Sequence, residues 1–209
     1  MRLILLGAPG AGKGTQAHRL KDRLAIPHIS TGHLFRAQLK EGTALGKTAD
    51  EYIGRGELVP DTLVVDMVDE RLKDRDALEG CILDGFPRTL GQAEALDASG
   101  LTIDHVVEID VDSELLVGRL TGRLTCRDCG RMYHRTFDPP ATDACGDCSG
   151  ELFTRADDAE ETVRNRLSVY VSQTEPLLGH YHAAGLLRRV EGTGGPDAVE
   201  TRILAVLGD

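Results

Sequence analysis

A glycine-rich loop between an apolar run and a helical pattern constrains this chain most. The loop reads Gly7-Ala8-Pro9-Gly10-Ala11-Gly12-Lys13-Gly14-Thr15 and directly follows Leu3–Leu6. Its glycines leave space for backbone N–H groups to point inward at an oxyanion, and Lys13 adds a positive charge. The segment from Thr15 to Leu24 has helical spacing, so the positive end of its dipole faces the same anion. The sequence therefore predicts a phosphate-binding loop.

Two other interpretations of the loop remain open, an ordinary glycine-rich turn and a dinucleotide-binding turn. The second fits less well, because the spacing Gly10, Gly12, Gly14 is not G-x-G-x-x-G and the next apolar stretch ends in Ser30-Thr31 without an acid for a ribose. Gly14 stands where a triphosphate-binding loop usually has a Ser or Thr hydroxyl for Mg²⁺. We therefore expect the metal to be held mostly through phosphate, water and a carboxylate elsewhere.

Composition narrows the class of protein. A chain of 209 residues suits one α/β domain with an insertion. Its 24 Lys and Arg against 34 Asp and Glu give a net charge of −10, which disfavours nucleic acid or anionic lipid as a partner. No apolar run approaches the roughly 18 residues of a membrane span, and Met1–Leu6 is too short for a signal peptide. We expect a cytoplasmic protein with no membrane partner, and a monomer by default.

Short apolar runs alternate with helical patterns, which predicts a parallel sheet flanked by helices. The predicted strands are Arg2–Leu6, Pro27–Ser30, Cys81–Leu83, His105–Ile109 and Leu186–Val190. The predicted helices are Thr15–Leu24, Gly32–Glu41, Leu45–Arg55, Asp61–Asp74, Leu90–Ala98, Ser113–Thr121, Ala159–Ala184 and Pro196–Leu207. Residues 30–60 and 122–157 break the alternation and are interpreted as insertions on the core.

Four cysteines form two Cys-x-x-Cys pairs, and they are Cys126, Cys129, Cys145 and Cys148. The spacing predicts two knuckles whose thiolates close a tetrahedral Zn²⁺ site, and four thiolates leave no open position, so the metal is structural. Reduced cysteines without metal are the plain alternative. A nucleic-acid-binding zinc ribbon is the functional rival, but acidic residues are mixed with the basic ones in this segment.

Asp84 directly follows the apolar run Cys81–Leu83, and ligands of open α/β sheets bind beyond the carboxyl ends of strands. That position suits a carboxylate that holds Mg²⁺ directly or through water, although a turn or capping acid before Gly85 explains it as well. Planar guanidinium groups near glycine-rich turns and insertion edges are able to clamp phosphate bidentately, or are solvated surface groups. These arginines are Arg36, Arg88, Arg123, Arg155 and Arg166.

Several stretches occur in order along the whole chain. They are Gly7 to Thr15, Ser30-Thr31-Gly32, Asp84-Gly85-Phe86-Pro87-Arg88, Arg119-x-x-x-Arg123, and Arg155-x-Asp157-Asp158 followed by Arg164-x-Arg166. Together they resemble the adenylate kinase family, and the cysteine quartet resembles the zinc-bearing lid of many bacterial members. The resemblance implies a P-loop nucleoside monophosphate kinase fold, an α/β fold with a five-stranded parallel sheet flanked by helices, an AMP-binding flap and a lid insertion.

The activity implied is MgATP + AMP ⇌ 2 ADP, which serves adenine nucleotide homeostasis, with Mg²⁺ and structural Zn²⁺ as cofactors and ATP, AMP and ADP as small-molecule substrates. The implied core is residues 1–29, 60–121 and 157–209, with the AMP-binding flap at 30–59 and the lid at 122–156. Lys13, Asp84, Arg88, Arg123, Arg155 and Arg166 are the implied catalytic residues.

The same resemblance implies the nucleotide contacts. ATP would be held by Gly10, Ala11, Gly12, Lys13, Gly14, Thr15, Arg119, Arg123, Met132, Tyr133, His134 and Gly194. AMP would be held by Thr31, Arg36, Glu57, Leu58, Val59, Gly85, Phe86, Pro87, Arg88, Gln92, Arg155 and Arg166.

Two positions depart from the family pattern. His33 stands where relatives usually have Asp near the magnesium waters, which predicts an altered pH–rate profile around pH 6.5, or a substitution of little consequence. Leu124 follows Arg123 where many relatives carry a second arginine, which favours weaker ATP binding. A UMP/CMP kinase is the nearest alternative, but Thr31 fits the adenylate kinase pattern better. A GTPase lacks support because no Asn-Lys-x-Asp run is present.

Overall fold

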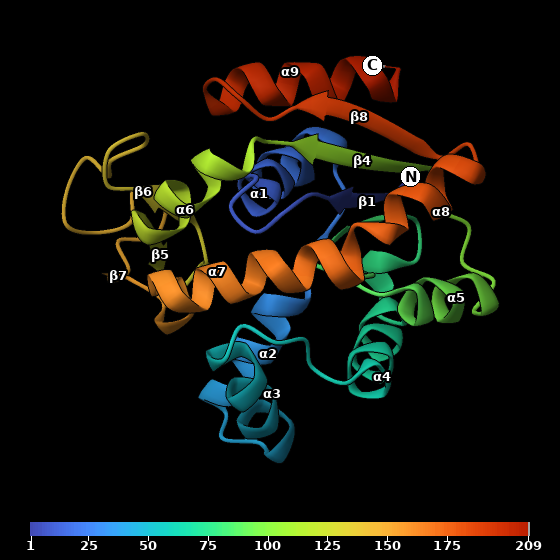
Figure 1. The fold of residues 1–209 in the computed structure, drawn as a ribbon, viewed down its shortest axis with the longest axis horizontal. Coiled ribbons are helices and arrows are strands. Elements are labelled where there is room, and N and C mark those ends of the chain that lie inside the picture. The colour runs from blue at the N-terminus through green and yellow to red at the C-terminus, as the bar shows by residue number, and fades with distance from the viewer. Residues whose placement is uncertain (209) are drawn as a thin grey trace.

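A five-stranded parallel sheet forms the centre of the computed structural model, which describes residues 1–208 (Figure 1). Its strands are β1 (Arg2–Leu6), β2 (His28–Ser30), β3 (Cys81–Asp84), β4 (His105–Asp110) and β8 (Leu187–Glu191). Their order in the sheet is β2-β3-β1-β4-β8, and every neighbouring pair is parallel. The fold class predicted from the apolar runs is confirmed, and each predicted strand lies within one residue of an observed one.

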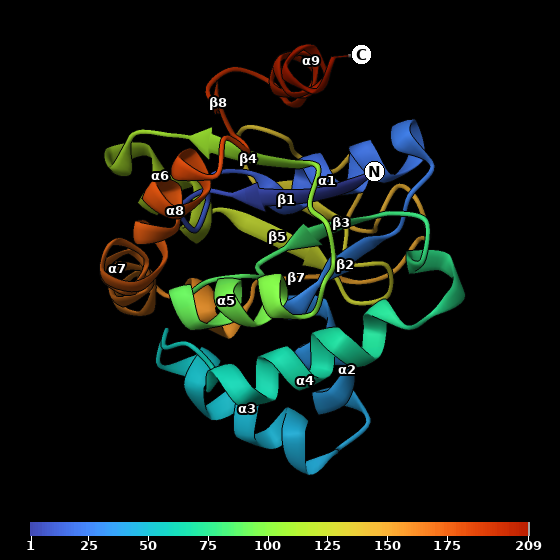
Figure 2. The ribbon, with the colours of Figure 1, turned by 90° about the vertical axis from the view of Figure 1, so that its right-hand side faces the viewer.

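Helices cover both faces of the sheet. They are α1 (Lys13–Leu24), α2 (Thr31–Lys40), α3 (Ala44–Gly54), α4 (Asp61–Leu72), α5 (Leu90–Ala98), α6 (Ser113–Thr121), α7 (Glu160–Val169), α8 (Pro176–Ala183) and α9 (Pro196–Leu207). In both ribbon views α9 lies beside β8 at one end of the sheet, whereas α2 and α3 lie beyond the β2 end (Figures 1 and 2). None of these helices, within residues 1–208, is long and apolar enough to cross a membrane.

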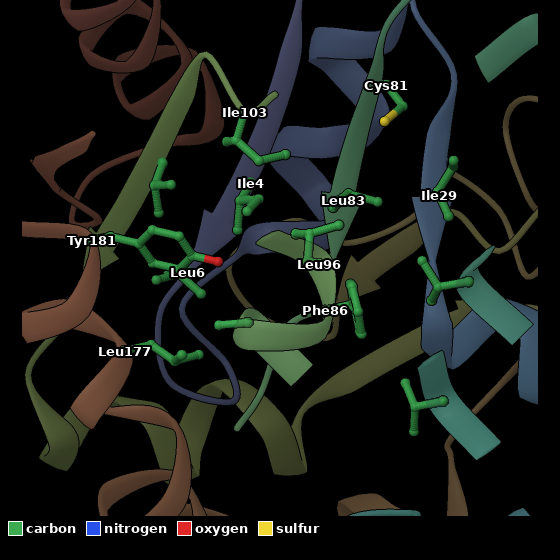
Figure 3. Close-up of a cluster of buried hydrophobic side chains, with 14 of the residues drawn as sticks. Ile4, Leu6, Ile29, Cys81, Leu83, Phe86, Leu96, Ile103, Leu177 and Tyr181 are labelled. Carbon is green, nitrogen blue, oxygen red and sulfur yellow. The ribbon is translucent and has the colours of Figure 1, made fainter. Parts of the chain in front are cut away.

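The core has two sides because side chains alternate along each strand. In β1, Ile4 and Leu6 belong to one buried cluster, which α5 and α8 complete (Figure 3). Leu3 and Leu5 belong to a second cluster on the opposite face, packed against α1 and α9. Every residue of this strand from Leu3 to Leu6 is buried, as expected of a central parallel strand covered on both faces.

The single helix predicted over Ala159–Ala184 is wrong. The structure has α7, a π-helical turn over Tyr170–Thr174, and then α8. Pro176 explains the interruption, because it has no N–H to continue the α-helical ladder and its ring crowds the carbonyl of the preceding turn. The wider turn accommodates this, and the backbone N–H of Glu175 bonds to the Tyr170 carbonyl five residues earlier, at 2.9 Å.

The segment that contains the four cysteines has strands that the sequence did not predict. β5 (Arg123–Cys126) pairs antiparallel with β6 (Met132–His134) and with β7 (Leu152–Phe153). These strands are only two to four residues long. Their side-chain pattern is too short to show a period of two, so only the turn residues and the cysteines mark the segment.

We predict that Leu96→Ala lowers the free energy of unfolding by about 2–5 kcal/mol, because the truncation leaves a cavity in the first core cluster. Leu96 is 2% exposed. Leu90 begins the same helix but is 43% exposed, so Leu90→Ala is the matched control and should change the free energy by less than about 0.5 kcal/mol. Urea unfolding of the two variants checks this, and equal losses would contradict the assignment of Leu96 to the core.

Candidate active site

The carboxyl ends of the parallel strands bring the predicted site residues to one edge of the sheet. Register pairs Leu5 of β1 with Asp84 of β3, and Asp84 with Ser30 of β2. The glycine-rich loop therefore begins beside Asp84, and Thr31 lies on its other side. This edge is where open α/β sheets bind their ligands.

The glycine-rich loop needs its glycines for conformation and for space. Gly7, Gly10 and Gly12 have φ of 138°, 88° and 100°. A Cβ at Gly7 would lie 2.5 Å from the carbonyl oxygen of Ile109, so no side chain fits there. The loop is held close to β4 and its shape is fixed before any ligand arrives.

Lys13 begins α1 at the end of this loop and bends back over it. Its Nζ donates to the carbonyl oxygens of Gly7 at 2.6 Å and Ala8 at 3.0 Å. Burial lowers the pKa of Lys13 to about 8, although the nearby carboxylate of Asp84 acts in the opposite direction. The ammonium group is therefore already desolvated and stands at the loop where an anion would bind.

Gly14, which lacks the hydroxyl expected of a triphosphate loop, makes room for two other groups. A Cβ at this position would collide with the terminal methyl of Met132 and lie 3.4 Å from Oδ2 of Asp84. The glycine thus admits the carboxylate and the Met132 side chain close to the loop. This geometry supports the expectation that a carboxylate outside the loop faces the metal.

Asp84 is a buried carboxylate held by a histidine that the sequence analysis missed. Nε2 of His28 lies 3.1 Å from Oδ2 of Asp84. Burial raises the pKa of Asp84, but the hydrogen bond with His28 and the charge of Lys13 outweigh it, so the pKa lies well below its usual range. The group is an anion at neutral pH and faces the cavity, which fits a magnesium ligand or its water partner.

One cavity of about 720 Å³ brings nearly all the predicted nucleotide residues together. Those that line it are Gly10, Ala11, Gly12, Lys13, Gly14, Thr15, Thr31, Arg36, Glu57, Leu58, Val59, Asp84, Gly85, Pro87, Arg88, Gln92, Arg119, Arg123, Met132, Tyr133, His134, Arg155, Arg166 and Gly194. Phe86 is the exception: it does not line this cavity, and its assignment as an AMP contact stays a prediction. It is 2% exposed and belongs to the hydrophobic core, because it follows a strand end and its ring turns inward.

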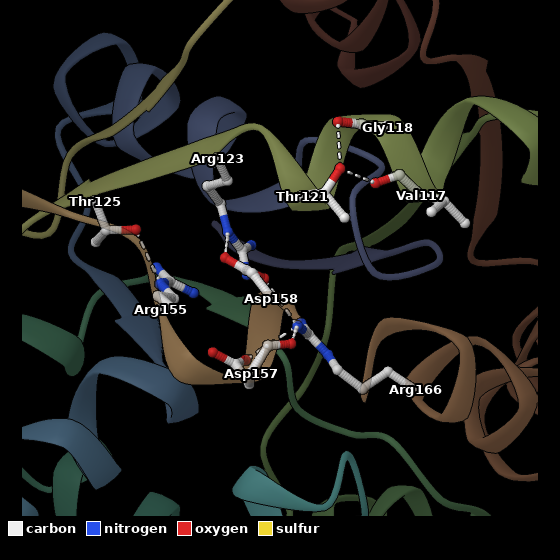
Figure 4. A network of polar contacts seen from close by, with 9 residues as sticks. All are labelled: Val117, Gly118, Thr121, Arg123, Thr125, Arg155, Asp157, Asp158 and Arg166. Carbon is white, nitrogen blue, oxygen red and sulfur yellow. Dashed lines mark hydrogen bonds and ion pairs between the residues drawn. The ribbon is translucent and has the colours of Figure 1, made fainter. Parts of the chain in front are cut away.

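A network of arginines and aspartates forms one wall of the cavity (Figure 4). Arg123 donates to both carboxylate oxygens of Asp158, at 2.8 and 2.5 Å. Arg166 bridges Asp158 at 3.1 Å and Asp157 at 3.0 Å. The Asp158 side chain is fully buried, so this carboxylate fixes two guanidinium groups from different segments in one geometry.

The guanidinium groups of the cavity are desolvated and mutually repulsive. Burial lowers the pKa of Arg36 to about 10, and burial also lowers the pKa of Arg88, Arg155 and Arg166. Nearby arginine charges act in the same direction as burial in each case. A bound anion would stabilise these desolvated positive charges, and a polyphosphate is an anion of sufficient charge.

The β2–β3 side of the cavity is organised by hydrogen bonds around Gly85. Thr31 Oγ1 donates to the Gly85 carbonyl at 2.9 Å, and Arg88 Nε donates to the same oxygen at 2.9 Å. Gln92 is buried, accepts from the Arg88 backbone N–H at 2.8 Å and donates to Asp61 at 2.7 Å. These contacts hold the predicted AMP residues in fixed positions.

The opposite end of the cavity has a flat aromatic wall. His134 and Phe137 are stacked with ring centroids 4.4 Å apart and planes at 27°. Phe137 is 71% exposed, so the ring is accessible to a ligand. Arg119 lies at the same end and donates to the Gly192 carbonyl at 3.0 Å. A planar base fits between a guanidinium and these rings.

Sequence reasoning missed four residues that hold or line the site: His28, Phe137, Asp157 and Asp158. The pair Asp157-Asp158 was part of the motif quoted for the resemblance but was given no role. The sequence gives a weak indication of Phe137, because it is an aromatic residue in a segment otherwise rich in polar residues. The sequence gives no indication of His28, since its contact with Asp84 depends on the pairing of β2 with β3.

The four predicted metal ligands converge. All four Sγ atoms lie within 4.8 Å of one another. The two Cys-x-x-Cys turns have the same form: the Gly130 N–H bonds to the Cys126 carbonyl and the Ser149 N–H bonds to the Cys145 carbonyl. Gly130 and Ser149, the residues after each second cysteine, both have positive φ. Two matching knuckles with four sulfur donors fit a tetrahedral metal such as zinc.

His33 corrects one expectation. It lines the cavity, but burial and the neighbouring Arg36 lower its pKa to about 3. The imidazole is therefore neutral between pH 5.5 and 7.5 in this conformation, and it does not provide the titration near pH 6.5 on which the expected pH–rate change depended.

We predict that this burial appears in the pH dependence of stability. Unfolded His33 takes up a proton below its ordinary pKa of 6.5, whereas the folded imidazole stays neutral down to about 3. The unfolded state binds more protons in that window, so the free energy of unfolding falls as the pH drops below 6.5. His33→Gln lacks this titration, so its free energy of unfolding should fall less. The difference between variant and parent should therefore shift by about 1 kcal/mol in favour of the variant as the pH drops from 7.5 to 5.5. Urea unfolding at both pH values measures this, and an unchanged difference would contradict a buried neutral imidazole.

Comparison with known proteins agrees with this geometry. The family model described as "Adenylate kinase" matches residues 5–186. The chain is 54% identical to an adenylate kinase of Syntrophobacter fumaroxidans, with all of both chains covered. It is 51% identical to one of Geobacillus sp. over all of this chain and 99% of the relative. The chain therefore belongs to the adenylate kinase family, enzymes that transfer a phosphoryl group reversibly between ATP and AMP to give two ADP.

Proposed function

We propose that this chain binds MgATP and AMP at opposite ends of the one cavity and transfers the terminal phosphoryl group between them. One observation carries the proposal. The glycine-rich loop, the Asp84 carboxylate and guanidinium groups from two inserted segments all line the same cavity. The nearest alternative acceptor is a pyrimidine nucleoside monophosphate.

The donor end is the loop and the segment around Phe137. The backbone of Gly10 to Thr15 and the Lys13 ammonium would cradle the ATP phosphates, and Arg123 would contact them from the opposite wall. Arg119 would cover one face of the adenine, and the stacked rings of His134 and Phe137 would cover the other. Met132, Tyr133 and Gly194 complete this end. Tyr133 contributes mainly through its backbone, because its hydroxyl accepts from the Gly146 N–H at 2.8 Å.

The acceptor end is built on β2, β3 and the segment after α3. Thr31, Gly85, Pro87, Arg88 and Gln92 would hold AMP from the sheet side. Arg36 and the residues Glu57, Leu58 and Val59 would hold it from the flap side. The Thr31 and Gln92 hydrogen bonds already fix this surface before AMP binds.

Phosphoryl transfer requires little covalent help from the protein, so no nucleophilic side chain is needed. The protein must place two oxygens in line and neutralise the charge on the transferring group. Arg155 and Arg166, supported by Arg88, would face that group, because all three line the cavity that would hold both nucleotides. Magnesium, when bound, would supply further positive charge, and Asp84 would hold it directly or through water.

The inserted segments would exclude water, which otherwise accepts the phosphoryl group in place of AMP. We assign the core to residues 1–29, 60–121 and 157–209, the flap to 30–59 and the lid to 122–156. We further propose a cytoplasmic monomer without a nucleic-acid or membrane partner, which the net charge of −10 supports.

We predict strict dependence on AMP. MgATP is supplied with AMP, UMP, CMP, GMP or no acceptor, and ADP formation is followed. AMP should exceed every other acceptor by at least about 100-fold, because buried hydrogen-bonding groups reject an analogue that leaves them unpaired. Faster turnover with UMP or CMP would favour the pyrimidine kinase, and rapid ADP formation without acceptor would contradict exclusion of water.

We also propose that the cysteine quartet binds structural Zn²⁺ and stabilises the lid without acting in the chemistry. The closed set of four donors supports this. Purified protein should contain about one zinc per chain. Replacement of Cys126 and Cys129 by Ser should remove the metal and lower the melting temperature first, and kcat should persist at temperatures where the lid stays folded.

Cys81→Ala is the control for this experiment. Cys81 is buried in the main core, away from the quartet, so its loss should leave the zinc content unchanged. Absence of zinc after metal-replete expression, or a large loss of kcat below the melting temperature of the lid, would overturn the structural role.

A further inference from the structure

The lid and the flap touch at His33, a residue to which the sequence gave no secure role. His33 is on α2 of the flap, and Gly130 belongs to the first cysteine knuckle of the lid. A Cβ at Gly130 would lie 2.7 Å from both Cε1 and Nε2 of His33. The edge of the imidazole therefore packs against the bare backbone of Gly130. Gly130 also has a φ of 75°, so the position favours glycine on two counts.

The other side of His33 faces the residue that holds Asp84. The rings of His33 and His28 are 5.7 Å apart at their centroids and tilted by 59°. His28 in turn lies 3.1 Å from the Asp84 carboxylate. Gly130, His33, His28 and Asp84 thus form a continuous row from the lid backbone to the carboxylate that faces the phosphates.

The charges around this row favour a neutral ring at its centre. Arg36 and Arg155 face His33 from the flap and from the segment after β7, and His28 and Asp84 face it from the sheet. A cationic side chain here would repel the guanidinium groups, and a flexible one would leave the contact with Gly130 unfilled. An uncharged imidazole satisfies both conditions.

We propose that His33 is a positioning residue that couples the two substrate sites: the closed lid presses His33 against His28, and this holds the flap and the Asp84 carboxylate in the reactive arrangement. The inference rests on the proposed assignment of ATP to the lid end and AMP to the flap end. In this proposal the contact forms as the lid closes over ATP, and the energy of the contact would then appear as cooperativity between the nucleotides.

The test measures the coupling factor directly. Calorimetry gives the affinity for AMP with and without a saturating ATP analogue that has a methylene group between its β and γ phosphorus atoms. The ratio of the two affinities is the coupling factor, and by linkage it is the same whichever nucleotide binds first. In His33→Ala the factor should fall about fivefold or more, while the affinity for AMP alone changes less than about twofold.

Gly130→Ala provides the second arm, since its new methyl group would push the imidazole out of place. In the parent it should lower the coupling factor, and in the His33→Ala background it should have little further effect. Gly42→Ala is the matched control, because Gly42 has a φ of 74° and a Cβ there meets no atom within 4 Å. It should leave the coupling factor unchanged, which separates backbone strain from the contact.

Three outcomes overturn the proposal: a coupling factor near one in the parent, an unchanged factor in His33→Ala, or additive effects of Gly130→Ala and His33→Ala. His33→Gln, which keeps polarity and some bulk, should restore part of the coupling. If the parent forms ADP without any requirement for AMP, the proposed function is wrong, whatever the role of His33. If turnover depends on AMP but the coupling factor is unaltered in His33→Ala, only the proposed role of His33 is wrong.

Discussion

Buried positive charge at the carboxyl edge of the sheet is the constraint on which the rest of the structure depends. Desolvation lowers the pKa of Lys13, Arg36 and Arg155, which means that each loses favourable hydration in its charged form. Few carboxylates oppose them, mainly Asp84 and the pair Asp157-Asp158. A chain with a net charge of −10 thus keeps one strongly cationic interior, and the acids elsewhere on its surface do not reach it.

This arrangement explains the division of labour between the sheet and the inserted segments. The sheet edge supplies fixed geometry, because the loop after β1 and the carboxylate after β3 are held by strand register. The segments outside the sheet supply most of the guanidinium groups, which must approach a ligand from the side opposite the loop. The Asp158 carboxylate binds both Arg123 and Arg166 and so links β5 to α7. Charge neutralisation and enclosure are achieved by the same residues.

The sequence predicted the parts of the fold whose cause is local. The apolar runs predicted all five central strands. The strands β1 and β3 are buried on both faces, so their runs are almost wholly apolar, whereas the edge strand β8 has exposed Arg188 and Arg189 and was predicted from the apolar residues around them. The glycine loop and the cysteine pairs were predictable because φ above zero and metal coordination demand particular residue types at fixed spacing. The π-helical turn was missed because helical periodicity continues across it, and only Pro176 indicates the break.

Residues whose role depends on packing between distant segments were not predictable. His28 reaches Asp84 only because β2 pairs with β3, and the neutral state of His33 depends on its burial where α2 meets the first Cys-x-x-Cys turn. The stack of Phe137 on His134 requires the strands β5 and β6, which are too short to show a pattern. Spacing along the chain indicates which residues belong to a functional motif. Their protonation states and hydrogen-bond partners depend on contacts that form only in the folded structure.

Phe86 has a consequence for how substitutions in this enzyme are interpreted. Its ring is buried among the core residues, yet its neighbours Gly85 and Pro87 line the cavity. The ring therefore anchors the short stretch that presents the acceptor surface. A change at Phe86 moves that surface through the core, so a screen that records only activity would group it with the residues that line the cavity. Measuring foldedness and affinity separately is what distinguishes an anchor from a contact.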